Sequence, residues 1–77
     1  MSLTEAPIEV RLKIKEINSG HESKRKLSSV GIHIDDIILK HNDNKWGPVI
    51  LENLTIRSNK LAIGREIANK IIVENEQ

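Results

Sequence analysis

The sequence has no cysteine and a single aromatic residue, and each of these absences excludes a class of protein. Without cysteine there is no disulfide framework, thiolate zinc site, iron–sulfur cluster or cysteine nucleophile. Trp46 is the only aromatic side chain, so the core must be built from Ile, Leu and Val. No apolar run approaches the roughly 18 residues of a membrane-spanning helix. No charged-then-apolar signal segment opens the chain. We therefore expect a small cytoplasmic domain that does not insert into membranes.

The charges are nearly balanced. Twelve basic and eleven acidic residues give a formal net charge of +1. This balance gives no general electrostatic reason to expect nucleic acid or a membrane surface as partner. The 77 residues are enough for one domain, residues 1–77, near the lower limit at which a single apolar core suffices.

The first third of the chain predicts a strand followed by a short helix. Residues 10–17, VRLKIKEI, alternate in polarity, with Val10, Leu12 and Ile14 on one face. Next, residues 19–22 have the S-x-x-E spacing of a capping box, which predicts a helix over about residues 20–29. Gly31 stands where a left-handed residue ends a helix, and Ile32 beyond it can pack back on Leu27, with Val30 also directed to the core.

The remainder predicts strands with one further helical turn. Residues 36–42 are predicted to form a strand and residues 42–47 a hairpin loop. Residues 48–58 follow as another strand. Its apolar residues change from one face to the other near Asn53, where we expect a bulge or bend. Residues 60–63 are a short strand, residues 64–70 a helical turn and residues 70–74 the last strand. The order predicts a mainly β fold: a small five-stranded SH3-like barrel with one short α-helix after the first strand and a helical turn before the last.

Metal-binding and catalytic interpretations find little support. The candidate metal ligands have the imidazole and carboxylate groups that suit a divalent ion such as Fe²⁺, and they are His21, His33, His41, Asp35, Asp36 and Asp43. Their spacing matches no ligand motif, which predicts surface histidines and no tight metal site or cofactor; weak binding of Fe²⁺ or another divalent metal by two ligands is left open. Of these pairs, His33 and Asp35 could share a face. Ser28 and Ser29 have no evident His or Asp partner, so no catalytic residue is predicted.

Two other features have alternative explanations. The basic run Lys24, Arg25 and Lys26 reads as the solvated face of the helix; a nucleic-acid patch, extended by Lys13 and Lys15, is the alternative. Trp46 in a turn-rich loop is either a plug at the edge of the barrel or an anchor for a partner.

Taken in order, these landmarks resemble the ferrous iron transport protein A (FeoA) family of small cytoplasmic SH3-like barrels. The resemblance covers about residues 3–74 and is carried by Leu3 with Pro7, VRLKIKEI, KRKLSSVGI, WGPVIL, KLAIGREIA and KIIVE. The chain departs from the family pattern at turn positions: Val30 replaces a frequent Met, Ile34-Asp35 replaces a Pro-Gly turn, and Ile8 replaces a Gly.

The resemblance implies a non-enzymatic accessory protein of ferrous iron uptake that binds a membrane iron permease with a GTPase domain (FeoB). We expect the contact at the strand of residues 60–63, through Leu61 and Ala62 with Trp46 nearby, although Leu61 fits the core equally well. The alternatives are a small transition-metal-binding regulatory domain, as in iron-dependent repressors, or a nucleic-acid-binding small barrel. Weak self-association is left open.

Overall fold

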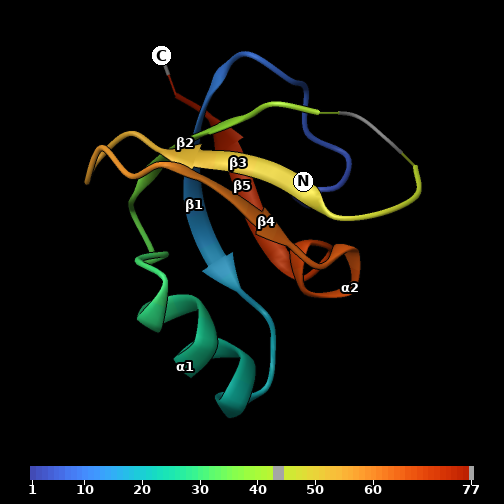
Figure 1. The fold of residues 1–77 in the computed structure, drawn as a ribbon, viewed down its shortest axis with the longest axis vertical. Helices are drawn as coiled ribbons and strands as arrows, with labels where there is room; N and C mark the ends of the chain where they lie inside the picture. Colours follow the sequence, from blue (N-terminus) through green and yellow to red (C-terminus); the bar gives the residue numbers. More distant parts are fainter. Residues whose placement is uncertain (43–44, 77) are drawn as a thin grey trace.

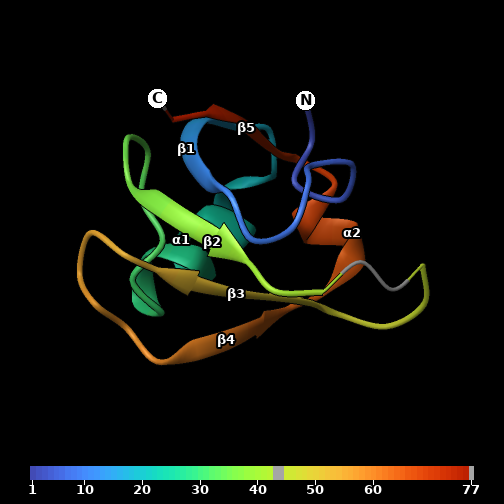
Figure 2. The ribbon, with the colours of Figure 1, turned by 90° about the horizontal axis from the view of Figure 1, so that it is seen from above.

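Five antiparallel strands form one curved sheet with two short helices. The computed structural model describes residues 1–42 and 45–76. Along the chain the elements are β1 (Arg11–Ile17), α1 (His21–Ser29), β2 (Ile37–Lys40), β3 (Val49–Asn53), β4 (Lys60–Ile63), α2 (Arg65–Ala68) and β5 (Ile71–Asn75). The sheet order is β4-β3-β2-β1-β5, and Figures 1 and 2 show these strands following one another round the curve. This is the predicted mainly β, SH3-like architecture.

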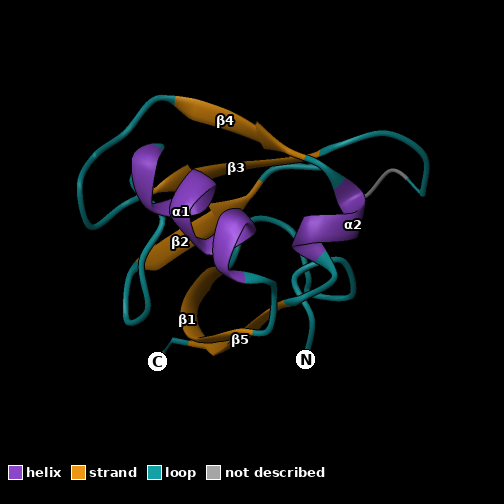
Figure 3. Cartoon of the chain, turned by 90° about the horizontal axis from the view of Figure 1, so that it is seen from below, coloured by secondary structure: helices purple, strands orange, loops and turns teal. Residues whose placement is uncertain are grey.

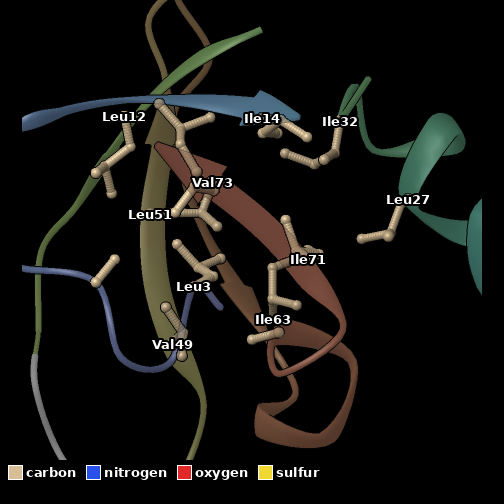
Figure 4. Packing of buried hydrophobic residues seen from close by; sticks show 13 residues of the cluster. Leu3, Leu12, Ile14, Leu27, Ile32, Val49, Leu51, Ile63, Ile71 and Val73 are labelled. Atoms are coloured by element: carbon tan, nitrogen blue, oxygen red, sulfur yellow. The ribbon is translucent and has the colours of Figure 1, made fainter. Parts of the chain in front are cut away.

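The core is aliphatic because the strands alternate. In β1, Leu12 and Ile14 are buried, and in β3, Val49 and Leu51 are buried, while their neighbours are partly or fully exposed. Figure 4 shows these side chains converging with those of β5, the N-terminal segment and α1. The fully or almost fully buried apolar residues are Leu3, Ala6, Leu12, Ile14, Leu27, Ile32, Ile38, Val49, Leu51, Ile63, Ala68, Ile71 and Val73. Val10 and Val30, which we expected in the core, are exposed: Val10 precedes β1, and Val30 is the residue at which α1 ends.

The end of α1 forms as predicted. Gly31 has φ of 87°, and its N–H donates to Ser28 O, while the N–H of Ile32 donates to Leu27 O at 2.8 Å. This pair of bonds is the Schellman arrangement, which satisfies carbonyls that a helix end leaves without partners. Leu27 and Ile32 are both buried, so the turn is fixed to the core from both sides.

The predicted start of α1 is wrong by one residue. The N-cap is Gly20, with no side-chain hydrogen bond, so Ser19 lies outside the helix. Its buried Oγ has no hydrogen-bond partner among the described residues. With Gly20 as N-cap, Glu22 is the second helical residue and cannot make the reciprocal bond of a capping box, which requires the third.

The bend near Asn53 is the end of β3 rather than a bulge. Buried Asn53 donates from Nδ2 to Gly31 O and to Asp36 Oδ2, both at 2.7 Å. The chain then turns through Leu54–Arg57 instead of continuing as a strand, which leaves Ile56 exposed. The register shift lies elsewhere, in the β1–β5 pairing between Ile14 and Glu16.

The first residues of the chain pair with the last strand, β5. Ser2 bridges to Ile72, the N–H of Leu3 donates to Ile71 O, and the N–H of Val73 donates to Met1 O, each of the two bonds at 2.8 Å. Residues 1–3 therefore cover the outer edge of β5. In the described part of the chain, no helix is long and apolar enough to cross a membrane.

Candidate partner-binding surface

β4 is an edge strand with its outer side uncovered. It pairs with β3 from Val49↔Ile63 to Glu52↔Lys60, and no other strand of the described residues flanks it. Because the opposite edge, β5, is covered by residues 1–3, the edge left open by the sheet lies at β4. An open edge presents backbone N–H and C=O groups to which an extended segment of a partner can add.

The three residues predicted to bind a partner differ in their exposure. Trp46 is 88% exposed, so it does not plug the barrel and is free to act as an anchor. Ala62 is exposed on the outward side of β4, whereas Leu61 is partly buried and packs against the core. The surface that a partner can reach is therefore formed by Ala62 and the β4 backbone, and Leu61 supports it from beneath.

Trp46 and β4 are related through the β2–β3 loop. Trp46 lies three residues before Val49, whose register partner Ile63 is the last residue of β4. Figure 3 shows this loop and α2 at the same end of the sheet, the end toward which β4 runs. Along the chain, Trp46 therefore precedes the part of β3 that pairs with the last residue of β4.

The three histidines have different surroundings. His21 is exposed at the start of α1. His41 lies between two carboxylates, with Nδ1 3.3 Å from Glu9 Oε1 and Nε2 3.1 Å from Glu52 Oε1. In residues 1–42 and 45–76 no group of three or more His, Asp and Glu side chains could hold a metal ion, and Asp43 lies outside these residues.

His33 contacts Asp36, whereas we had considered that it could share a face with Asp35. The His33 N–H donates to Asp36 Oδ2 at 3.0 Å, and its ring Nδ1 is 3.5 Å from the same oxygen. Asp35 faces Lys13 instead, at 3.9 Å. The reason is the positive φ of Asp35, 74°, which turns the chain between the two carboxylates and directs Asp36 inward.

The structure corrects the expectation that Ser28 lacks a histidine and aspartate neighbour. Ser28 Oγ is 3.2 Å from His33 Nε2, and His33 in turn contacts Asp36, which is the order of a serine hydrolase relay. The hydroxyl nevertheless lies in the last turn of α1, where backbone carbonyls point outward. The negative end of a helix opposes a developing oxyanion, and the contact joins α1 to the segment that precedes β2.

The basic run is not extended by β1. Lys24, Arg25 and Lys26 are exposed along α1. Arg25 and Lys26 line a shallow depression together with Glu22 and Ser29. Lys13 and Lys15 instead form ion pairs. Lys13 Nζ lies 3.9 Å from Asp35 Oδ1, and Lys15 Nζ lies 3.6 Å from Glu74 Oε1. Trp46 belongs to a different loop, so no aromatic side chain stands among these cations for a base to stack on.

Sequence reasoning missed Lys40 entirely. Its side chain is fully buried, and Nζ donates to Thr4 O at 3.0 Å and to Ala6 O at 2.8 Å. The signal was present in the alternation of β2, in which Ile38 and Lys40 share the inward face. A lysine in such a position is normally expected at the surface.

Comparison with known proteins identifies the family. Residues 1–75 match the FeoA domain. Over 64 residues the chain is 38% identical to the "Putative Fe(2+) transport protein A" of Methanocaldococcus jannaschii, covering 83% of this chain and 73% of that protein.

Solved structures agree on the fold. A crystal structure of an iron uptake regulatory protein (FeoA) superposes with a TM-score of 0.86 at 24% identity, covering 99% of this chain and 97% of that one. The iron(II) transport protein A of Clostridium thermocellum gives 0.83 at 20%, covering 97% and 45%. The manganese regulator SloR gives 0.80 at 13% identity, covering 97% and 34%, so the barrel is shared with a part of that larger protein. With a domain match over nearly its whole length and a curated relative at this identity, the chain belongs to the FeoA family.

Proposed function

We propose that the protein is a non-enzymatic cytoplasmic accessory of ferrous iron uptake, and that it acts by binding the membrane iron permease that carries a GTPase domain. The observation that carries the proposal is the FeoA domain match over residues 1–75. The architecture supports it, because a small barrel with one open sheet edge and an exposed tryptophan presents a surface for a protein. The protein acts through this surface without a resident metal or cofactor.

The contact surface is the open edge of β4 with Ala62, together with Trp46. Tryptophan is enriched among interface residues whose truncation costs most of the binding energy. Trp46 has almost its whole surface available in the free protein, 88%, so its burial by a partner would remove a large apolar area from water.

A pull-down tests the proposal. The immobilised protein is incubated with the purified cytoplasmic region of the permease from the same genome, including its GTPase domain. We expect capture by the wild type and, for Trp46→Ala, an affinity at least about tenfold lower, because an anchor of this type contributes about 2 kcal/mol or more. The control is Val30→Ala, which removes an exposed apolar side chain at the end of α1.

The outcomes separate clearly. Circular dichroism melting establishes that both variants are folded, since tryptophan fluorescence is lost in one of them. Absence of capture by the wild type at micromolar concentrations of both proteins would refute the proposed function. Capture that is weakened by Val30→Ala but unaffected by Trp46→Ala would move the contact surface to α1.

A further inference from the structure

Four cationic residues belong to β4 or to segments that adjoin it. Lys60 begins β4 and Arg57 lies in the turn before it. Arg65 begins α2 directly after the strand, and Lys45 lies in the β2–β3 loop, four residues before Val49, the register partner of Ile63. In the described part of the chain none of the four makes an ion pair, whereas Lys13 and Lys15 on β1 each have a carboxylate within 4 Å. The edge therefore has a local positive charge, although the net charge of the whole chain is only +1.

The nearest carboxylate on the sheet is already engaged. Glu52 is the register partner of Lys60 on β3. Its Oε1, however, lies 3.1 Å from His41 Nε2, on the side of β3 away from β4. Lys60 is thus left to solvent, and a carboxylate supplied from outside can approach it without displacing an internal partner.

Arg65 provides the second sign of a missing acceptor. It opens α2 immediately after β4 and Gly64, and its Nε is buried without any hydrogen bond in the described structure. A buried donor without an acceptor is costly, by about 1–3 kcal/mol. Guanidinium groups are well matched to carboxylates, which accept two parallel hydrogen bonds. Because Nε itself is enclosed by the chain, a carboxylate from outside would meet the terminal Nη groups of this guanidinium.

The space beside the edge suits an extended segment. Ala62 is the outward side chain in the middle of β4 and is small. A Cβ placed on Gly64 would meet no atom within 4 Å, so the exit from the strand is open as well. The strand itself spans four residues, which at about 3.3 Å per residue is a length on the order of 13 Å.

From these observations we infer that β4 receives an acidic, extended segment of the partner, which adds to the sheet as a further strand. One acidic residue of the segment faces Arg57 and Lys60 and another faces Lys45 and Arg65. They are about four positions apart, on one face of the added strand, with small or apolar residues between them. This inference rests on the proposed function and specifies the chemistry of the partner's segment. It predicts association that weakens with salt, because exposed charges are screened.

A peptide titration tests the inference without the permease. The probe is a designed peptide, Glu-Val-Thr-Val-Glu, whose two Glu are four positions apart and so share one face of a strand. Its counterpart has both Glu replaced by Gln. Binding is followed by amide chemical shifts of the ¹⁵N-labelled protein and by the fluorescence of Trp46, the only aromatic residue. We expect shifts concentrated on β4 and the β2–β3 loop, and at least tenfold weaker binding of the Gln peptide.

Two double variants with the same change in charge locate the site. Lys45→Glu with Lys60→Glu should weaken the Glu peptide at least tenfold, while Lys24→Glu with Lys26→Glu on α1 should leave its affinity within about twofold. Shifts that map onto α1, equal binding of the Gln peptide, or no binding of the Glu peptide at millimolar concentration would each overturn the inference. So would a single-stranded RNA oligonucleotide that binds the β4 edge more tightly than the peptide.

The pull-down then distinguishes the two proposals. If the wild type captures the permease region and the Lys45→Glu, Lys60→Glu variant captures it equally well, the proposed function stands and the acidic-strand inference fails. If the wild type captures nothing but the peptide titration succeeds, the edge binds acidic segments and the proposed partner is wrong.

Discussion

At the scale of single residues, Lys40 shows how a charge is used inside this small core. Its ammonium group donates to two carbonyls of the N-terminal segment, Thr4 O and Ala6 O, from a fully buried position on β2. Burial of a charge is tolerated only where hydrogen bonds compensate for lost hydration. Lys40 therefore links the N-terminal segment to the middle of the sheet, in a chain with few large side chains to fill that space.

Replacing Lys40 by Met should destabilise the protein by about 2–4 kcal/mol. The substitution keeps much of the volume but leaves two carbonyls without their donor, each at about 1–3 kcal/mol. Urea unfolding measures the difference. Lys24→Met on the exposed face of α1 removes the same charge and should change stability by no more than about 0.5 kcal/mol. Equal effects of the two substitutions would show that the buried hydrogen bonds contribute nothing specific.

At the scale of elements, the turn after α1 combines two constraints on one glycine. Gly31 has a positive φ, 87°, and a Cβ added to it would lie 2.6 Å from Ile56 Cδ1. Gly47 also has a positive φ, 89°, yet a Cβ there would meet nothing within 4 Å. An alanine at Gly47 would therefore add backbone strain alone, whereas an alanine at Gly31 would add strain and a steric collision.

Gly47→Ala should cost about 1–2 kcal/mol from strain alone, and Gly31→Ala about 1 kcal/mol more, measured by urea unfolding. The excess should disappear when Ile56 is first replaced by Ala, since that removes the atom in collision. A double-mutant cycle for Gly31→Ala and Ile56→Ala gives this coupling directly. A coupling near zero would mean that the Ile56 side chain moves aside freely and only strain distinguishes Gly31 from other residues.

Sequence patterns predicted the C-terminal end of α1 correctly and its N-terminal end incorrectly, for a physical reason. The stop at Gly31 follows from glycine's access to positive φ together with Leu27 and Ile32, so three neighbouring residues specify it. The start depended on one S-x-x-E match, which local sequence cannot distinguish from the Gly20 cap that the structure has. The end of β3 was hidden because Asn53 is bound by Gly31 and Asp36, residues distant in sequence.

At the scale of the whole molecule, the candidate surface was only partly visible in the sequence. Trp46, Leu61 and Ala62 were named from local composition, and the strand bounds 60–63 are those observed. That β4 is the edge left open depends on the pairing of Met1–Leu3 with β5 at the far end of the chain. The gathering of cations from the β2–β3 loop, the β3–β4 turn and α2 likewise requires the sheet order, which alternation of polarity does not determine.

The covering of β5 can be tested by releasing its anchor. Leu3 is 0% exposed and Ile8, in the same segment, is 40% exposed. Leu3→Ala should therefore lower stability by about 2–4 kcal/mol, and Ile8→Ala by much less. The Val73 N–H, which donates to Met1 O, should exchange with solvent faster in Leu3→Ala by a larger factor than the Ile14 N–H, which donates to Asp36 O.

The same variant should also associate with itself. Once residues 1–3 leave β5, the sheet has two open edges, and an uncovered strand edge is a template for pairing with another copy. Sedimentation at increasing concentration should show a larger species for Leu3→Ala than for Ile8→Ala. If Val73 and Ile14 exchange faster by the same factor and both variants stay monomeric, the N-terminal segment opens only when the barrel unfolds. Its cover over β5 would then be inseparable from the fold and could not explain why β4 alone is left for a partner.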